Sequence, residues 1–210
     1  MTVINKLACS LNRRDEVPNQ ELAKQIVKKN DKAAVKELVD NLSNKSRDIQ
    51  NDCIKVIYEI GEPMPSLIAP YAKEFVALLS SRNNRMQWGA MAALDKITLE
   101  TPKLIYSFLA KIVAAADSGS VITRDNCVNI LIKLCSIKQY ADDAFALLTE
   151  QILNSPPNQV AMYAERAMPI INEKNKTKFV AILSSRLGDM EKETQKKRIT
   201  KVISKFSSKK

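Results

Sequence analysis

The sequence predicts an all-α array of stacked helical repeats, because one twelve-residue apolar pattern recurs along it at a nearly fixed interval. The clearest copy is MQWGAMAALDKI, at residues 86–97, and its apolar residues fall on one helical stripe about 80° wide. Further copies lie at residues 49–60, 123–134, 160–171 and 195–206. The fifth residues of the five copies are separated by 37, 37, 37 and 35 residues. A fixed period of this length is typical of tandem repeats that stack around a continuous core.

Four positions of the pattern stay apolar in every copy. In a chain that is 45% apolar, chance would fill these twenty positions with apolar residues about once in ten million trials. The alternative, five unrelated amphipathic helices in a bundle, leaves the even spacing unexplained. We therefore expect these twenty residues to form the core. They are Cys53, Ala90, Cys127, Ala164, Ile199; Val56, Ala93, Ile130, Ala167, Val202; Ile57, Leu94, Leu131, Met168, Ile203; and Ile60, Ile97, Leu134, Ile171, Phe206.

Composition is consistent with a single helical domain in the cytoplasm. The chain has 210 residues, only four glycines and no apolar run near the roughly 20 residues that a membrane span needs. Its N-terminus has basic residues after a weak apolar stretch, unlike a secretory signal. We therefore expect a cytoplasmic protein without a membrane partner.

Two of the four cysteines, Cys53 and Cys127, are predicted to be packing residues. None forms a C-x-x-C pair, and Cys53 and Cys127 occupy a column that holds alanine in two other copies. Free buried thiols suit a reducing compartment. Histidine is absent from the chain, so a zinc site or an activated nucleophile would lack its commonest partner. There is also no glycine-rich phosphate-binding motif. We predict no metal, no cofactor and no catalytic residue.

Helix boundaries follow from capping residues and prolines. Asn19 is predicted to cap a first helix and Asp31 a second, at residues 32–42. The helix that carries the first copy of the pattern is predicted to end at Gly61, a favourable C′ residue, because Pro63 and Pro65 forbid its continuation. The helices that precede the later copies are predicted at residues 66–80, 103–116, 141–153 and 176–187. The predicted organisation is a single domain, 1–210, with a degenerate N-terminal cap at 1–30, repeats at 31–62, 66–99, 102–136, 139–172 and 174–206, and a basic tail at 207–210.

The columns resemble the second helix of HEAT repeats, which are helical hairpins that stack into curved α-solenoids. In that pattern an apolar residue and a polar or basic one precede a small residue, then Leu and Ile. The matching residues are Met86-Gln87, Ala90, Leu94 and Ile97, and Thr123-Arg124, Cys127, Leu131 and Leu134. The resemblance covers residues 31–206. It implies a right-handed α–α superhelix of about five hairpins plus a degenerate N-terminal repeat, used as a binding scaffold.

Positions opposite the core stripe are predicted to face outward and to bind a partner. Trp88, the only tryptophan, lies outside the stripe, and Met162 and Tyr58 fall on the same side. Three basic residues flank them: Lys55, Arg124 and Arg166. An apolar patch bordered by positive charge suits a protein or peptide partner of acidic character. The alternative is that Trp88 folds over the neighbouring helix and closes a gap between repeats.

Positive charge concentrates at the C-terminal end of the chain. The formal net charge is +10, and residues 191–210 contribute eight basic and two acidic side chains. One interpretation is a solvated face that caps the last repeat. The other is a contact site for an acidic partner or for nucleic acid. Its four residues would be Lys196, Lys197, Arg198 and Lys201.

The predicted function is a non-enzymatic scaffold that binds a protein or peptide on the concave surface of the array. The alternative is a nucleic-acid-binding protein, including an enzyme similar to the HEAT-like DNA alkylpurine glycosylases. That resemblance implies an aromatic and a carboxylate, here Trp88 with Asp95 or Asp125. An aromatic content of only 5% and the terminal position of the positive charge disfavour this enzyme. Self-association is a third alternative.

Overall fold

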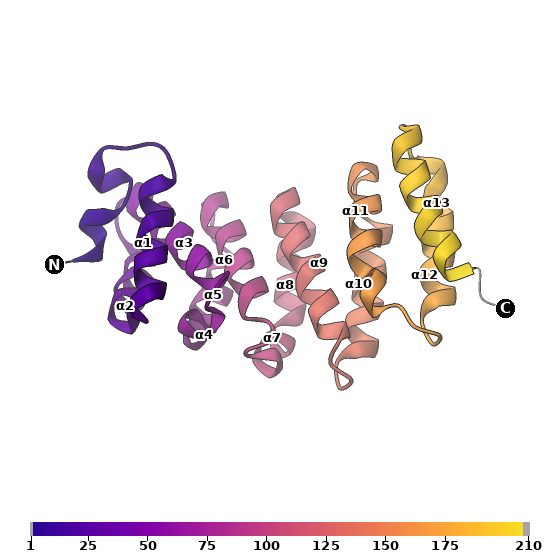
Figure 1. The fold of residues 1–210 in the computed structure, drawn as a ribbon, viewed down its shortest axis with the longest axis horizontal. Helices are drawn as coiled ribbons and strands as arrows, with labels where there is room; N and C mark the ends of the chain where they lie inside the picture. Colours follow the sequence, from indigo (N-terminus) through magenta and orange to yellow (C-terminus); the bar gives the residue numbers. More distant parts are fainter. Residues whose placement is uncertain (1, 208–210) are drawn as a thin grey trace. The chain divides into compact units, whose positions relative to one another are not determined.

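The computed structural model describes residues 2–207, and every regular element among them is helical (Figure 1). The chain forms two compact units, Met1–Cys127 and Val128–Lys210, which we call unit 1 and unit 2. Their boundary falls inside helix α9, Val121–Cys135. The division into repeats within one domain stays a prediction, and apart from Ser207 the predicted tail lies outside the described residues. No helix within residues 2–207 is long and apolar enough to span a bilayer.

Unit 1 begins with two short 3₁₀ helices followed by a pair of α-helices. Asp31 caps the second α-helix as predicted, since its carboxylate accepts a hydrogen bond from the Ala34 N–H at 2.9 Å. The prediction that Asn19 caps the first is wrong, because that helix begins two residues earlier with Pro18 in its first turn. The bounds are η1 Val3–Lys6, η2 Cys9–Leu11, α1 Val17–Lys29 and α2 Lys32–Asp40.

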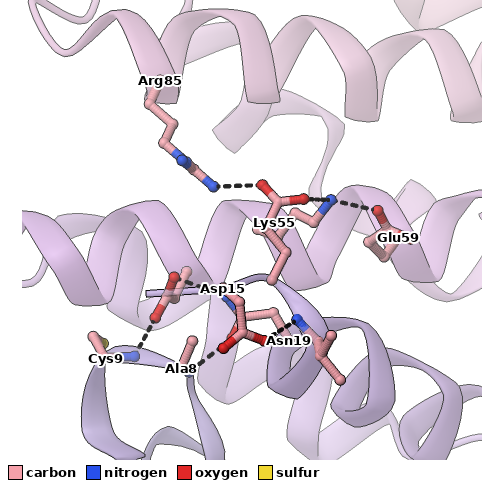
Figure 2. A network of polar contacts seen from close by, with 10 residues as sticks. Ala8, Cys9, Asp15, Asn19, Lys55, Glu59 and Arg85 are labelled. Carbon is pink, nitrogen blue, oxygen red and sulfur yellow. Dashed lines mark hydrogen bonds and ion pairs between the residues drawn. The ribbon is translucent and has the colours of Figure 1, made fainter. Parts of the chain in front are cut away.

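Asn19 is a buried link rather than a cap. Its side-chain oxygen accepts a hydrogen bond from the Ala8 N–H at 3.0 Å, and its amide group donates to Asp52 at 2.8 Å. Asp52 also accepts from the Cys9 N–H at 2.8 Å. Because Asp52 lies on α3, Arg47–Gly61, these bonds hold the N-terminal segment against that helix (Figure 2). An amide suits this position because it can donate and accept at once.

Glycines allow close approach between α3 and α6, Asn84–Ile97. A Cβ added at Gly89 of α6 would lie 2.7 Å from Ile54 Cγ1 of α3, and one added at Gly61 of α3 would lie 3.0 Å from Lys96 Cβ of α6. Gly61 is the last residue of α3 and has no positive φ. The helix thus ends at Gly61 as predicted, but Gly61 is needed there for packing and is not a C′ residue beyond the helix end.

The first helices of two repeats in unit 1 are broken, where the sequence predicted continuous helices at 66–80 and 103–116. The first becomes α4, η4 and α5, and the second becomes α7 and α8. Pro70 explains the first break, because it lacks an N–H and its ring clashes with the preceding turn. The second break falls at Phe108. The bounds are η3 Asn41–Ser43, α4 Pro65–Ile68, η4 Ala69–Tyr71, α5 Ala72–Leu78, α7 Pro102–Ser107 and α8 Leu109–Ser118.

Unit 2 contains the end of α9 and two helix pairs. α10 spans the predicted residues, whereas α11 stops short of Pro169, which lies in the 3₁₀ helix that follows it. The last helix, α13, packs against both α11 and α12. The bounds are α10 Ala141–Leu153, α11 Pro157–Ala167, η5 Met168–Ile170, α12 Lys176–Arg186, η6 Leu187–Asp189 and α13 Glu193–Ser207.

A buried arginine at the end of α12 ties the two helix pairs of unit 2 together. The guanidinium of Arg186 pairs with Asp189 at 2.5 Å and is 7% exposed as a residue. It donates to the carbonyl oxygens of Ile152 (2.7 Å), Leu153 (2.5 Å) and Ser155 (2.9 Å). These carbonyls lie at or just past the end of α10, where no N–H of the helix reaches them. The helix dipole also favours a cation there.

The predicted core columns are buried in both units. Sixteen of the twenty residues are buried, and the other four, Met168, Ile171, Ile203 and Phe206, are partly exposed. Cys53 and Cys127 are fully buried, as predicted for packing residues. Burial raises the pKa of the Cys127 thiol to about 12, so this thiol stays protonated at neutral pH.

Candidate functional site

Two aromatic side chains from neighbouring helices meet at the surface of unit 1. Tyr58 of α3 and Trp88 of α6 have ring centroids 5.7 Å apart and planes tilted by 48°. Both residues are half-buried. We call them the aromatic pair. A tilted contact at this distance is more favourable than burial alone, so the pair links the two helices. Both residues also remain partly exposed.

A cation lies over each ring of the aromatic pair. The ammonium of Lys55 is 4.9 Å from the Tyr58 centroid, and the guanidinium carbon of Arg85 is 5.8 Å from the Trp88 centroid. Each cation precedes its ring by three residues on the same helix, a spacing that makes side chains neighbours. Such cation–π contacts add attraction and fix the orientation of the ring.

Glu16, at the residue before α1, joins the two cations. Its carboxylate Oε2 lies 2.7 Å from Lys55 Nζ, and Oε1 lies 3.1 Å from Arg85 Nη2. Lys55 also pairs with Glu59, one helical turn further along α3, at 2.7 Å. Figure 2 shows this line of contacts from Arg85 to Lys55 and Glu59. We call the two contacts made by Glu16 the Glu16 bridge. It joins α1, α3 and α6 on one surface of unit 1.

The charges of the bridge are stabilised by one another. The hydrogen bond from Lys55 is the main reason that the pKa of Glu16 lies below its ordinary value. Burial alone would lower the pKa of Lys55, but its bonds to Glu16 and Glu59 outweigh burial and raise it. Lys55 is only 5% exposed. The expectation that Lys55 faces outward is therefore wrong, because the segment before α1 covers that side of α3.

A polar cavity of about 640 Å³ adjoins the bridge. It lies between the segment that precedes α1 and the N-terminal part of α3, and Arg85 reaches it from α6. Most carboxylates in its wall are already engaged: Asp52 by backbone and amide donors, and Asp15 by Arg13 at 2.8 Å. Within residues 2–207 no group of carboxylates and thiols is arranged to hold a metal ion.

The other three predicted partner-binding residues lie elsewhere in the sequence, and the contacts described for them are with residues outside the aromatic pair. Arg124, on the first turn of α9, lies 3.9 Å from Asp117 and its side chain is 16% exposed. Met162 is half-buried on α11 of unit 2, and the exposed Arg166 donates to Asn129 at 3.2 Å. The structure thus brings together Lys55, Tyr58 and Trp88. The binding roles of all six residues stay predictions.

The predicted basic cluster lies on α13 of unit 2. Arg198 makes a two-pronged ion pair with Glu165 of α11 at 2.8 and 2.6 Å, and Lys196 pairs with Glu193 at 3.1 Å. The exposed residues Lys197 and Lys201 line a shallow cavity of about 630 Å³ along the helix. Two of the four predicted cations are thus engaged within the unit.

Known structures establish the fold. No protein-family model and no curated protein matches the chain. A computationally designed armadillo repeat protein for modular peptide recognition shares 17% identity with it, over 89% of this chain and 86% of that one, with a TM-score of 0.67. A designed armadillo repeat protein in complex with peptide (KR)4 shares 19% over the same fractions, with a TM-score of 0.66. The archaeal HEAT-like repeats protein from Thermococcus onnurineus NA1 shares 14% over 93% and 98%, with a TM-score of 0.50.

The chain has a HEAT/armadillo-like α-solenoid fold. The helices α3 and α6 carry the first two copies of the apolar pattern, at residues 49–60 and 86–97, so the aromatic pair links two successive copies. Solenoids of one fold serve unrelated functions, so the fold alone assigns none.

Sequence reasoning missed Arg85 and Glu16. A usable signal for Arg85 existed, because KVIY at 55–58 and RMQW at 85–88 both place a basic residue three positions before an aromatic one. On adjacent helices of the solenoid, such matched spacing predicts two cation–aromatic contacts side by side. Glu16 gives no such signal, because it comes from an irregular segment whose position depends on Asn19 and Asp52.

Proposed function

We propose that the protein is a non-enzymatic scaffold that binds a protein or peptide partner at the aromatic pair of unit 1. The observation that carries the proposal is a partly exposed tyrosine and tryptophan held side by side, each with a cation stacked over it. Trp, Tyr and Arg are the residues most enriched among binding hot spots. The likeness to a designed protein for peptide recognition supports the proposal without carrying it.

The geometry favours a partner that is apolar and acidic together. The rings offer apolar area that loses little entropy on binding, because packing already restricts their rotamers. Lys55 and Arg85 place positive charge over the rings, where a partner's carboxylate gains attraction in a partly desolvated setting. Within unit 1, Arg124 is a further basic residue that the proposal assigns to the partner. In unit 2, Met162 and Arg166 are proposed as separate contacts of their own.

The test is the substitution Trp88→Ala. Partners captured from native lysate, with and without nuclease, are identified and then titrated against purified protein. We expect Trp88→Ala to weaken binding by about thirtyfold or more, equivalent to about 2 kcal/mol. Leu99→Ala is the matched control, because Leu99 is an apolar residue that is 56% exposed just after α6. Equal affinity of wild type and Trp88→Ala, with unchanged melting, removes the aromatic pair from the proposal.

A second candidate function is nucleic-acid binding by α13. The observation that favours it is the exposed pair Lys197 and Lys201 beside a shallow cavity in unit 2. Binding of this kind weakens steeply with salt, because counterions are released from the phosphates. Gel shifts with duplex and single-stranded probes test it. Lys197→Gln with Lys201→Gln should abolish a shift that the control pair Lys174→Gln with Lys178→Gln leaves intact. No shift at about micromolar protein ends this candidate.

The proposal also includes a cytoplasmic location and allows self-association as a competing use of the surface. All four cysteines are free thiols, which suits a reducing compartment. Fractionation of a tagged protein tests the location. Light scattering over a range of concentrations tests assembly, and a monomer at every concentration rules out self-association.

A further inference from the structure

We infer that Lys55 and Arg85 form a binding site for a carboxylate of the partner, and that Glu16 occupies this site as an internal competitor. The inference rests on the proposed function and adds to it the chemistry of the ligand. It assigns the partner an aspartate or glutamate that lies next to the apolar group covering the aromatic pair.

The position of the Glu16 carboxylate shows what the site recognises. One of its oxygens faces the ammonium of Lys55 and the other faces the guanidinium of Arg85, at 2.7 and 3.1 Å. The two cations come from successive repeats, and each also lies over one ring of the aromatic pair. A single carboxylate at this point therefore contacts both repeats. Two-point recognition by donors in fixed positions favours a planar anion over a point charge.

The Glu16 side chain is built to leave the site. It is 47% exposed, and residues 10–17 around it are all exposed. Glu16 precedes α1, but its side chain makes no capping hydrogen bond to that helix. The segment is held instead by Asn19 and Asp52, which do not depend on Glu16. Withdrawal of the carboxylate would thus cost two ion pairs and leave both α1 and the N-terminal segment in place.

The two cations stay poised when Glu16 withdraws. Lys55 keeps its ion pair with Glu59 at 2.7 Å, so its buried charge remains compensated. Arg85 keeps its contact with the Trp88 ring. The vacated site therefore remains cationic and ordered, as a receptor for an incoming carboxylate must be.

Two roles of Glu16 can be distinguished by its neutral variant: if Glu16 is a competitor, Glu16→Gln changes the affinity for acidic ligands in one direction, and if it is only a structural ion pair, it does not. A tethered carboxylate acts at a high effective concentration, so an external one binds with reduced apparent affinity until the tethered one is removed. If Glu16 competes, its neutral isostere raises affinity for acidic ligands. If Glu16 only braces the fold, the same change leaves that affinity equal or lowers it.

The experiment measures binding of a fluorescein-labelled, C-terminally amidated hexaglutamate peptide by anisotropy at low ionic strength. Fluorescence of Trp88, the only tryptophan, reports whether the peptide reaches this surface. We expect Glu16→Gln and Glu16→Ala to bind the peptide at least about tenfold more tightly than wild type. Adding Arg85→Gln to Glu16→Gln should reverse the gain, and a hexalysine peptide should not bind more tightly to any variant.

Glu173→Gln is the matched control, because Glu173 makes an equivalent exposed ion pair with Lys176 at 2.6 Å in unit 2. It removes the same charge and should leave the affinity at the wild-type value. If Glu173→Gln and Glu16→Gln gain equal affinity for hexaglutamate, the gain is explained by the change in net charge alone, and the inference is overturned. Unchanged or weaker peptide binding by both folded Glu16 variants also overturns it.

Failure of the inference can be told apart from failure of the proposed function. If the captured partner depends on Trp88 but its affinity is the same for wild type and Glu16→Gln, the scaffold function stands and the competitor is refuted. If Glu16→Gln gains hexaglutamate affinity while Trp88→Ala binds the captured partner normally, the carboxylate site stands and the scaffold function at the aromatic pair is refuted.

Discussion

Unit 1 and unit 2 share one core pattern, but different side-chain contacts hold neighbouring helices together in each. We call these contacts fastenings. In unit 1 the fastening is the Glu16 bridge and the aromatic pair, which are partly exposed. In unit 2 it is Arg186, buried against carbonyl oxygens at the end of α10. A partly exposed fastening can exchange its contacts with a ligand, whereas a buried one cannot do so without unfolding. The proposed binding surface therefore lies in unit 1, where the contacts between helices are partly exposed.

Charge separates the two units as well. Unit 1 holds 18 basic and 15 acidic residues, and unit 2 holds 15 basic and 8 acidic ones. In unit 1 the acidic residues neutralise cations at the candidate site, while α13 in unit 2 keeps Lys197 and Lys201 exposed. Binding of an acidic partner to unit 1 should therefore depend on where the partner's carboxylate lies. Binding of a negatively charged partner to unit 2 should instead weaken as the salt concentration rises.

Loss of Arg186 should give the largest effect. Arg186→Met removes its bonds to the Leu153 and Ser155 carbonyls and one of two bonds to the Ile152 carbonyl, which also accepts from Ser155 Oγ at 2.9 Å. Because the place is buried, we expect the free energy of unfolding to fall by about 3 kcal/mol. Urea denaturation followed by circular dichroism measures it. Arg166→Met, an exposed arginine in the same unit, should change stability by less than about 0.5 kcal/mol. Similar values for the two variants would show that Arg186 is not the fastening of unit 2.

Glycine packing should give the next effect and should differ between units. Gly89→Ala places a methyl group 2.7 Å from Ile54 Cγ1, so we expect a net loss of about 1–2 kcal/mol despite alanine's better helix propensity. Gly188→Ala in unit 2 meets nothing within 4 Å and should be nearly neutral. In an Ile54→Ala background the cost of Gly89→Ala should vanish. A cost that persists there would place the close approach elsewhere.

Glu16→Gln should cost less, about 1 kcal/mol at neutral pH, because the side chain is 47% exposed and solvent screens its ion pairs. The pKa of Glu16 is lower in the folded protein than in the unfolded chain, so its contribution is present above the ordinary value of 4.5. It is lost as the pH falls through the lower, folded pKa. Wild type and Glu16→Gln should therefore converge in stability in acid. A gap in melting temperature that is constant with pH would contradict this.

The smallest effect should come from the Glu165–Arg198 pair of unit 2. Its geometry is two-pronged, but the two side chains are 37% and 47% exposed, so Arg198→Gln should cost about 0.5 kcal/mol. The cost should shrink further in high salt, measured by thermal melting. A cost above that of Glu16→Gln would reverse the order that the comparison predicts.

The repeat and the core could be predicted because they depend on periodicity within the chain. Four of the five copies lie within single α-helices, the copy at 160–171 is divided between α11 and η5, and the columns of Cys53 and Val56 are buried throughout. The breaks at Pro70 and Phe108 were missed. Pro70 could have been recognised as a helix breaker, but the short helices α4, η4 and α5 that replace the predicted helix are not encoded by the apolar pattern.

The site was predicted only in part because it depends on contacts across the chain. Helical periodicity placed Trp88 and Tyr58 outside the apolar core stripe, and the two side chains meet as a pair in the structure. It could not show that a segment forty residues earlier covers Lys55, since no local pattern places Glu16 there. Arg186 was missed for the same reason, because its three acceptors lie more than thirty residues earlier in the chain.

The reach of Arg186 bears on any attempt to shorten or recombine this protein. A fragment that stopped before α12 would keep every residue of α10 yet lose the donors that complete its final turn. A chimera that joined α10 to an unrelated helical hairpin would lack the same hydrogen bonds, unless that hairpin carried an arginine at the position equivalent to Arg186. A cut between the predicted repeats 139–172 and 174–206 would separate these carbonyls from their donor, so a transplantable piece that contains α10 should extend at least to residue 189.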